Sequence, residues 1–270
     1  MAIINRTPDS FYDHGKTWQL DPALARAEEV IAAGAQILDI GGVKAGPGEA
    51  VDAQEEIERV VPTIAEIHRR HPEVLISVDT WRAEVAEEAI RAGAGLVNDT
   101  WAGWDPELIE VAGQHKVGYV CSHTGGITPR TRPHRVHFDD VVADVIRETT
   151  ALAERAAALG CPEELTFIDP THDFGKNTFH GLELLRRVDE LVATGWPVLM
   201  ALSNKDFVGE TVDRPVGERV AGTLAATAWA AARGVAAFRV HEVAETIDVI
   251  RMTAAIQGTA EPLATTRGLA

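Results

Sequence analysis

The chain contains little cysteine, little lysine and no long apolar run. Its two cysteines, Cys121 and Cys161, provide neither a disulfide framework nor the spacing of a zinc site, and we expect Cys121 to pack inside the protein. No apolar stretch approaches the roughly 20 residues that span a bilayer, and no signal segment opens the sequence. These absences exclude a disulfide-stapled secreted domain and predict a cytoplasmic protein that does not contact a membrane.

Positive charge is also scarce. The 25 lysines and arginines are outnumbered by 41 aspartates and glutamates, which gives a net charge of −16. An acidic surface repels phosphate backbones, so we expect no binding of nucleic acid. Only five of the basic residues are lysines, and Lys44, Lys176 and Lys205 all follow predicted strands. This placement indicates a ligand site rather than a solubilising surface.

Eight short apolar runs recur along the 270 residues, and each is followed by a helical stretch. Continuous apolar runs are typical of parallel strands covered on both faces. The repeat predicts an α/β protein, a (β/α)8 TIM barrel, as one domain over residues 1–258 with a tail over 259–270. We expect its strands over Ala2–Asn5, Gln36–Ile40, Val74–Asp79, Gly95–Asp99, Val117–Ser122, Leu165–Asp169, Pro197–Leu202 and Ala237–Val240.

Helices are expected between these strands, and glycine follows five of them. The expected spans begin at Asp21 and continue over Ala53–His71, Arg82–Ala92, Pro106–Gln114, Asp140–Leu159, a stretch to Thr194, Val216–Arg233 and a stretch to Gln257. Glycine directly after a helix indicates a left-handed stop. The five stops are Gly34, Gly93, Gly160, Gly195 and Gly234.

Each apolar run ends in a polar residue, where a TIM barrel places its chemistry. A carboxylate accepts two adjacent N–H donors, such as those of a 2-amino-pyrimidinone ring, and an amide both donates and accepts. Arg239 and His241 lie two residues apart on one strand, so they point the same way and suit an anion. The strand-ending residues are Asn5, Asp39, Asp79, Asn98, His123, Asp169, Lys205 and the pair Arg239 and His241.

Several of these residues have a structural alternative. Asp79 can cap the next helix, Asp39 can organise a turn before Gly41, and His123 can be a loop histidine with its hydrogen bonds satisfied. A further loop carries three arginines that form either a solvated face or a basic lid over an anionic ligand. They are Arg130, Arg132 and Arg135.

The motifs at the strand ends resemble those of the dihydropteroate synthases and the wider pterin-binding family. The matching segments are NRTPDSF at 5–11, DIGG at 39–42, ISVDTW at 76–81, VNDT at 97–100, IDP with FGKN within 168–177, LSNKDFVG at 202–209 and RVHEV at 239–243. The resemblance implies a TIM-barrel transferase of folate biosynthesis. Such an enzyme condenses 6-hydroxymethyl-7,8-dihydropterin pyrophosphate with 4-aminobenzoate, an aryl amine, and releases pyrophosphate.

The resemblance also assigns residues to roles. It implies that the pterin is bound by Asp79, Asn98, Asp169 and Lys205. It implies that pyrophosphate is bound by Asn5, Arg239 and His241, with Asn5 also holding the Mg²⁺ cofactor, and that Lys205, Arg239 and His241 are catalytic. A homodimer through the last helices follows from the same resemblance, with Trp229 as an interface candidate.

The loops for the second substrate depart from the family pattern. Where the family reads GGESTRPG this chain reads GGVKAGPG, which places Lys44 in the loop, and SRKS becomes a segment ending in Asp206. A carboxylate at Asp206 would repel that of aminobenzoate by about 1–4 kcal/mol. His172 and Asp173 are expected beside the pterin ring. We therefore expect a divergent second-substrate pocket, formed by Lys44, Phe174 and Asp206.

These departures predict a divergent second copy of the synthase, a transferase whose condensation activity is weak or lost while pterin binding persists. The alternative is a non-catalytic paralogue that binds a pterin or a sulfonamide. A folate-dependent methyl-transfer module shares the barrel, but its ligand has no pyrophosphate, so the Arg239 and His241 pair argues against it.

Overall fold

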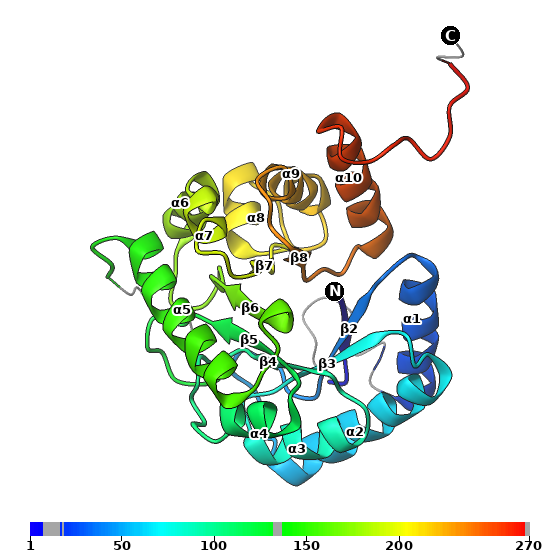
Figure 1. Cartoon of the computed structure of the whole chain (residues 1–270), viewed down its shortest axis with the longest axis vertical. Helices are drawn as coiled ribbons and strands as arrows, with labels where there is room; N and C mark the ends of the chain where they lie inside the picture. Colours follow the sequence, from blue (N-terminus) through cyan, green and yellow to red (C-terminus); the bar gives the residue numbers. More distant parts are fainter. Residues whose placement is uncertain (8–16, 18, 132–136, 268–270) are drawn as a thin grey trace.

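Eight parallel strands alternate with helices around a central ring (Figure 1). The computed structural model describes residues 1–7, 17, 19–131 and 137–267. Every strand that the sequence predicts is present, and the TIM-barrel class is confirmed. The strands are β1 (Ala2–Asn5), β2 (Ile37–Gly41), β3 (Leu75–Asp79), β4 (Leu96–Asp99), β5 (Gly118–Ser122), β6 (Thr166–Asp169), β7 (Leu199–Met200) and β8 (Ala237–Phe238).

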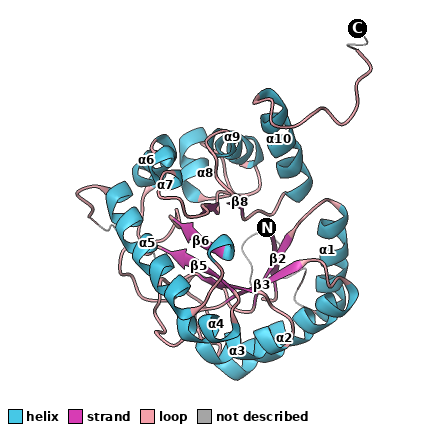
Figure 2. Ribbon diagram, in the orientation of Figure 1, coloured by secondary structure: helices cyan, strands magenta, loops and turns pink. Residues whose placement is uncertain are grey.

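The ring closes through two narrow joints. Strands β1 to β6 form one parallel sheet in sequence order, and β7 pairs with β8. A bridge between Ile168 and Val198 joins β6 to the β7 side, and a bridge between Ala2 and Val240 joins β8 back to β1. Figure 2 shows the strands inside and the helices outside. All eight C-terminal strand ends therefore meet at one mouth.

The helices cover the outside of this ring and agree broadly with expectation, with three differences. Helix α8 was not expected, the stretch after β6 is divided into α6 and α7 at Arg187, and α9 begins at Val220 rather than Val216. The described helices are α1 (Leu20–Ala32), α2 (Ala53–Arg70), α3 (Ala83–Arg91), α4 (Leu108–His115), α5 (Val141–Leu159), α6 (Thr178–Arg186), α7 (Val188–Val192), α8 (Asp206–Val212), α9 (Val220–Ala231) and α10 (Val243–Ile256). A short 3-10 turn, Glu163–Leu165, precedes β6.

The residues at the ends of the helices explain where several of them begin or stop. All five predicted glycine stops have a positive φ, between 86° and 119°. At Gly93 a Cβ atom would lie 2.4 Å from the His68 ring, so only glycine fits. Asp140 caps α5 by accepting from the backbone N–H groups of Val142 and Ala143. Asp21, by contrast, lies inside the first turn of α1 and makes no capping bond.

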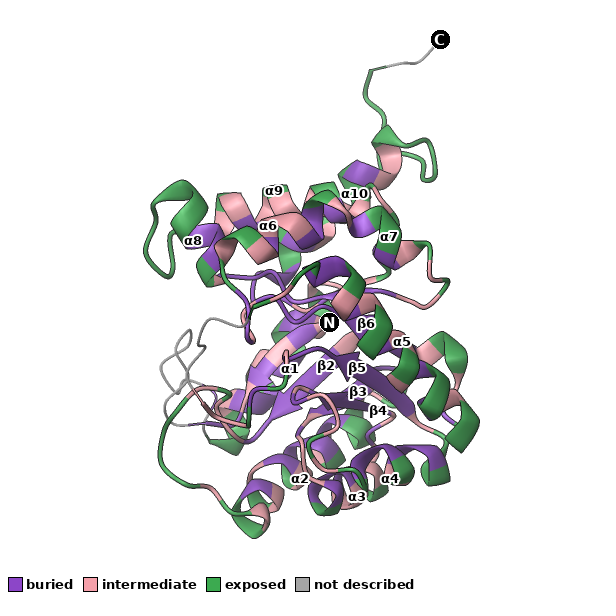
Figure 3. Cartoon of the chain, turned by 90° about the vertical axis from the view of Figure 1, so that its left-hand side faces the viewer, coloured by how far each residue is buried: buried purple, intermediate pink, exposed green. Residues whose placement is uncertain are grey.

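The core lies between the strands and the inner faces of the helices (Figure 3). Cys121 and Cys161 are both buried and free, as expected for packing residues. Residues 257–267 are exposed and carry neither helix nor strand, and they lead away from the barrel. Within the described residues no helix is both long enough and apolar enough to cross a bilayer.

Candidate functional site

A cavity of about 270 Å³ opens at the C-terminal ends of the strands. Nearly all of the residues predicted to bind ligand line it. Asn98 and Asp169 do not line it, and both are buried. The predicted residues that line the cavity are Asn5, Lys44, Asp79, Phe174, Lys205, Asp206, Arg239 and His241. Strand ends far apart in sequence therefore converge on one site.

Arg239 lies between two carboxylates. Its Nε donates to Asp39 Oδ2 across 2.5 Å, and its Nη2 donates to Asp79 Oδ2 across 2.7 Å. Asp39 is fully buried and also accepts from Ser77 Oγ at 2.6 Å and Asn98 Nδ2 at 3.1 Å. Asp39 is thus a buried partner of Arg239, not a turn residue. An aspartate inside the apolar run of β2 was the signal for this role.

Two buried carboxylates at this mouth have raised pKa values. Burial raises the pKa of Asp79 to about 6, and the Asp39 carboxylate adds to the effect while Arg239 opposes it. Burial also raises the pKa of Asp169 to about 6, although the backbone N–H of Thr171 donates to it across 2.7 Å. Thr100 Oγ1 donates to Asp79, and the N-cap residue of the next helix, α3, is Arg82, so Asp79 does not cap that helix. Both groups are ionised above pH 6, as acceptors of paired N–H donors must be.

Lys205 and an aromatic pair form another wall. Lys205 Nζ lies 3.3 Å from Asp173 Oδ2 and 5.8 Å from the centroid of the Phe174 ring. Phe174 packs edge-on against Trp101, with ring centroids 4.8 Å apart. Trp101 lines the cavity and was not predicted, although it follows the end of strand β4 directly. These aromatic faces suit a flat heterocycle.

His241 has one tautomer fixed by its neighbours. Ser203 Oγ lies 2.7 Å from Glu242 Oε2 and 2.9 Å from His241 Nδ1. A hydroxyl has one proton, and an ionised carboxylate only accepts, so we assign the Ser203 proton to Glu242. His241 Nδ1 must then be the donor, which leaves Nε2 as the acceptor. Burial, together with the nearby charges of Arg239 and Lys205, lowers the pKa of His241 to about 3.

Asp206 stands at the rim of the cavity beside an arginine. It is the first residue of α8, its side chain is 75% exposed, and its Oδ1 lies 2.9 Å from Arg219 Nη1. The same Nη1 donates to the Asn204 carbonyl at 2.9 Å. Arg219 was not predicted, because it precedes a helix distant in sequence from Asp206. The negative charge of Asp206 is therefore partly compensated.

The loop after β5 reaches across to the loop after β2. Arg130 Nη1 donates to the Glu49 carbonyl across 2.6 Å, and Ile127 and Thr131 line the cavity. Arg130 thus joins two loops beside the predicted second-substrate pocket. Arg132, Arg135 and residues 8–16 of the first loop lie outside the described residues.

Two of the remaining predictions are corrected. Lys176 does not line the cavity, because its Nζ donates to the carbonyls of His123, Thr171 and Phe174 and so ties β5 to the loop after β6. His172 is likewise buried, and it stacks on Phe207 with ring centroids 5.2 Å apart. Both residues support the loop that carries Asp173 and Phe174 rather than contacting the cavity.

His123 is neither a strand-end ligand of this cavity nor a fully satisfied loop histidine. It is completely buried, and its Nδ1 has no hydrogen-bond partner among the described residues. Burial lowers the pKa of His123 to about 4, with nearby Lys176 adding to the effect. Its Nε2 points away from the mouth toward α5, where it meets Asp144 at 3.0 Å.

The mouth of this barrel presents buried carboxylates, a lysine and an arginine–histidine pair. The sequence that forms it matches a known family. Residues 1–241 match the sequence model of the family described as pterin binding enzyme. The chain therefore belongs to the pterin-binding enzymes.

Individual relatives give a finer position within that family. The protein named "Inactive dihydropteroate synthase 2" of Mycobacterium leprae (strain TN) is 60% identical over 274 residues, covering 100% of this chain and 94% of that protein. The dihydropteroate synthase of Bacillus subtilis (strain 168) is 38% identical over 254 residues, covering 93% of this chain and 86% of that protein. The resemblance to a divergent second copy of the synthase is thus confirmed.

A solved structure supports the same fold. The crystal structure of the Yersinia pestis dihydropteroate synthase in a sulfonamide drug complex superposes with a TM-score of 0.89 at 36% identity. The match covers 95% of this chain and 93% of that one.

Proposed function

We propose that this chain binds 6-hydroxymethyl-7,8-dihydropterin pyrophosphate and that its condensation with 4-aminobenzoate is weak or lost. One observation carries the proposal. The cavity keeps Asp79, Lys205, Arg239 and His241 together, while Asp206 stands on its rim at the second-substrate side. The naming of the 60% identical relative as inactive supports the same conclusion.

The pterin side has the chemistry that a 2-amino-pyrimidinone ring requires. Asp79 lines the cavity, and its carboxylate accepts paired N–H donors once ionised. Trp101 and Phe174 supply aromatic surface, and Lys205 supplies a cation for a ring carbonyl. Asn98 donates to Asp39 and so orders the base of this side.

The pyrophosphate side would rest on Arg239 and His241, and Asn5 fits Mg²⁺ there. The Asn5 side chain offers a neutral amide oxygen at the cavity, a hard ligand of the kind that Mg²⁺ takes together with phosphate oxygens and water. When bound, the ion would neutralise charge on the leaving pyrophosphate. Arg239 would then bind the anion with its planar pair of N–H donors.

The second-substrate side would disfavour an anionic aryl amine. Asp206 places a carboxylate near the expected position of the aminobenzoate carboxylate, and Arg219 offsets it only in part. In the facing loop, Val43, Lys44 and Ala45 line the cavity. Lys44 provides a charge but not the forked geometry of an arginine.

Pyrophosphate release with purified protein and Mg²⁺ tests the proposal. The pterin pyrophosphate is supplied with and without 4-aminobenzoate, and its binding is measured by calorimetry. We expect the pterin pyrophosphate to bind with and without 4-aminobenzoate. Release of pyrophosphate should be slow or independent of 4-aminobenzoate. Rapid release that requires 4-aminobenzoate would make the chain a working synthase and overturn the loss of condensation. Absence of pterin binding would overturn the proposal entirely.

A graft of the family loops provides a matched control. The combined variant Val43→Glu, Lys44→Ser, Ala45→Thr, Gly46→Arg and Asp206→Ser restores the family residues around the second substrate. If the pterin half is intact, the graft should gain release that depends on 4-aminobenzoate. A graft that folds and binds pterin yet stays inactive would place the defect elsewhere.

We further propose a homodimer formed through α9, in the cytoplasm. Helices α6, α8 and α9 border an apolar groove of about 300 Å³ that is lined in part by Ala226 and Trp229, and Trp229 is 45% exposed. The free cysteines suit a reducing compartment. Sedimentation of Ala226→Glu tests the dimer. The variant should sediment as a monomer if the groove is the interface, and an unchanged oligomer would contradict it.

A further inference from the structure

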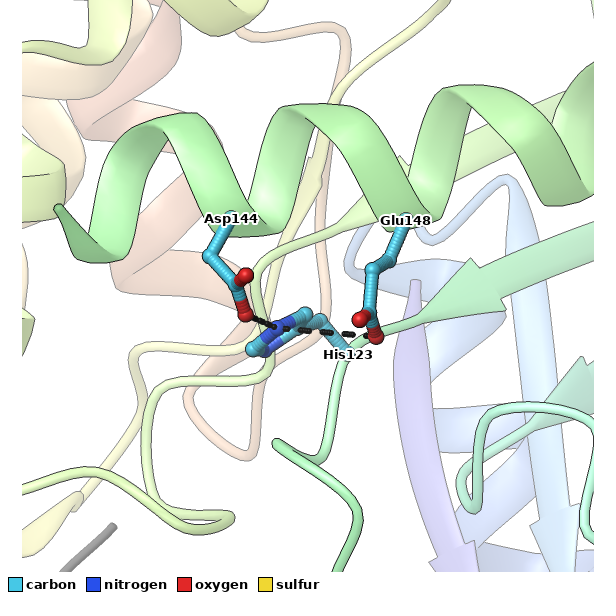
Figure 4. A group of neighbouring side chains, drawn as sticks. All are labelled: His123, Asp144 and Glu148. Atoms are coloured by element: carbon cyan, nitrogen blue, oxygen red, sulfur yellow. Dashed lines mark hydrogen bonds and ion pairs between the residues drawn. The ribbon is translucent and has the colours of Figure 1, made fainter. Parts of the chain in front are cut away.

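A histidine and two carboxylates meet on the outer side of β5, away from the mouth. His123 Nε2 lies 3.0 Å from Asp144 Oδ2 and 3.9 Å from Glu148 Oε2. Figure 4 shows that both carboxylates project from the same face of α5 toward the imidazole. One ligand atom from each residue lies within 4.8 Å of the others. Three donors so close together approach the separations found around a single small cation.

A second cavity, of about 520 Å³, is bordered by Asp144 and Glu148. Gly125, Gly126 and Phe138 form other parts of its wall, and it shares no lining residue with the cavity at the mouth. An ion would therefore have access from solvent and room for water as a further ligand. The buried imidazole and the open carboxylates together make a half-enclosed site.

We propose that His123, Asp144 and Glu148 bind a divalent transition-metal ion of the zinc class. One imidazole nitrogen with two carboxylate oxygens is a donor set that Zn²⁺ accepts in four-coordinate sites with water in the open position. Mg²⁺ and Ca²⁺ take oxygen ligands, so the imidazole disfavours them. The fixed position of the buried ring lowers the entropy lost on binding.

Arg147 now partly neutralises the two carboxylates. Its Nη2 contacts Asp144 Oδ1 and lies 3.2 Å from Glu148 Oε1. The Arg147 side chain is 64% exposed, so its displacement would return a long side chain to water and leave no buried charge. Arg147 is therefore a competitor that a metal ion must replace, and removal of Arg147 should strengthen metal binding.

The site is connected to the mouth through the backbone of His123. The His123 carbonyl accepts from Lys176 Nζ across 2.8 Å, and the His123 N–H donates to Thr171 Oγ1 across 3.2 Å. Lys176 and Thr171 belong to the loop that carries Asp173 and Phe174. A metal ion on His123 would thus hold in place the segment that shapes the first cavity.

Equilibrium dialysis against Zn²⁺, together with the visible spectrum of the Co²⁺ form, tests the proposal on the full chain. We expect one saturable site and the intense bands of four- or five-coordinate Co²⁺. Glu148→Gln and Asp144→Asn should each weaken Zn²⁺ binding about tenfold or more. Arg147→Ala should tighten it about fivefold. Glu110→Gln, which removes an exposed carboxylate paired with Arg155, serves as the matched control and should change nothing.

Several results would overturn the proposal. A Co²⁺ spectrum with only the weak bands of the hydrated ion would exclude the four- or five-coordinate site, whatever the variants do. Zn²⁺ binding that is unaltered in Glu148→Gln, or weakened equally in Glu110→Gln, would show adventitious binding to the acidic surface. Thermal unfolding of each variant without metal checks that it is folded. We expect folded variants, because both carboxylates are at least partly exposed.

Discussion

Arg239 Nη2 donates to Asp79 Oδ2 across 2.7 Å, which joins the residue proposed to hold pyrophosphate to the residue proposed to hold the pterin. Asp39 contacts the same guanidinium from the other side at 2.5 Å. Without ligand, the cation is therefore shared by two carboxylates. Binding of an anion at Arg239 must compete with Asp79, and the two halves of one ligand are coupled through this pair.

The Asp79→Asn substitution should have opposite effects on the two halves of the ligand. It removes a charge that binds Arg239 and repels phosphate, so the affinity for inorganic pyrophosphate should rise about tenfold. The affinity for a pterin should fall, because an amide offers one acceptor atom where a carboxylate offers two side by side for paired N–H donors. Calorimetry with each ligand measures both. The Asp206→Asn control, which removes an acid without freeing Arg239, should change pyrophosphate binding far less. Weaker pyrophosphate binding in Asp79→Asn would contradict the coupling.

Pyrophosphate binding should take up a proton at His241. The Glu242–Ser203 pair leaves a lone pair on His241 Nε2, which must gain a proton before it can donate to phosphate. Calorimetry in buffers of different ionisation enthalpy should detect the uptake of about one proton. In Glu242→Gln the amide can donate to Ser203, the hydroxyl can then donate to Nδ1, and Nε2 becomes the N–H. The proton uptake should disappear in this variant, and equal uptake in both proteins would contradict the assigned tautomer.

The Asp206→Ser substitution should improve binding of 4-aminobenzoate. It removes an exposed carboxylate from the rim and frees Arg219, whose Nη1 now lies 2.9 Å from Asp206 Oδ1. Screening by solvent limits the gain to about fivefold, or about 1 kcal/mol. Binding is measured by calorimetry with the pterin site filled. Glu210→Gln, on the same helix and away from the cavity, is the control and should bind like the parent. An unchanged affinity in Asp206→Ser would remove Asp206 as the cause of lost condensation.

His172 should make the protein sensitive to acid. Burial lowers its pKa from 6.5 to about 3, with Lys176 and Lys205 adding to the effect, and neither ring nitrogen has a hydrogen-bond partner among the described residues. Between these pH values the unfolded chain binds more protons, so the stability present above pH 6.5 is lost as the pH falls. This one group should cost about 2 kcal/mol of unfolding free energy between pH 7 and pH 5. The loss should shrink by that amount in His172→Leu.

Chemical denaturation at a series of pH values measures this difference. His137→Leu is the matched control, because the His137 side chain is 89% exposed. It should keep the pH dependence of the parent. Parallel pH profiles for the parent and His172→Leu would show that the buried ring is not the cause.

The sequence was sufficient for the strand order, because each strand is a local apolar run and each helix stop is a local glycine. Gly34 and Gly160 illustrate this, since a positive φ is a property of one residue. Helix α8 was missed because it has only seven residues, begins soon after β7 and carries no side-chain cap. Its existence depends on tertiary packing of Phe207 and Val208, which no short window reveals.

The site was predicted at the level of its residues but not of their pairings. The positions of Asp79, Lys205 and Arg239 at strand ends were enough to bring them to one mouth. The contact of Arg239 with Asp39, 200 residues away, depends on barrel closure and therefore on the register of every strand. Lys176 was misjudged for the same reason, since a lysine after a strand can equally tie two loops together. Such pairings are properties of the closed ring.

The residues at the mouth of the barrel come from two unequal groups of strands, the six-stranded sheet β1–β6 and the pair β7–β8. Ser203 and Lys205 follow β7, and Arg239 and His241 follow β8. All four therefore belong to the β7–β8 pair, which the bridges Ile168–Val198 and Ala2–Val240 join to the rest of the barrel. Asp39, Asp79 and Asp169 belong to the six-stranded ladder. The Arg239 bonds to Asp39 and Asp79 therefore fasten the β7–β8 pair to the six-stranded sheet through side chains, where the backbone pairing is sparse.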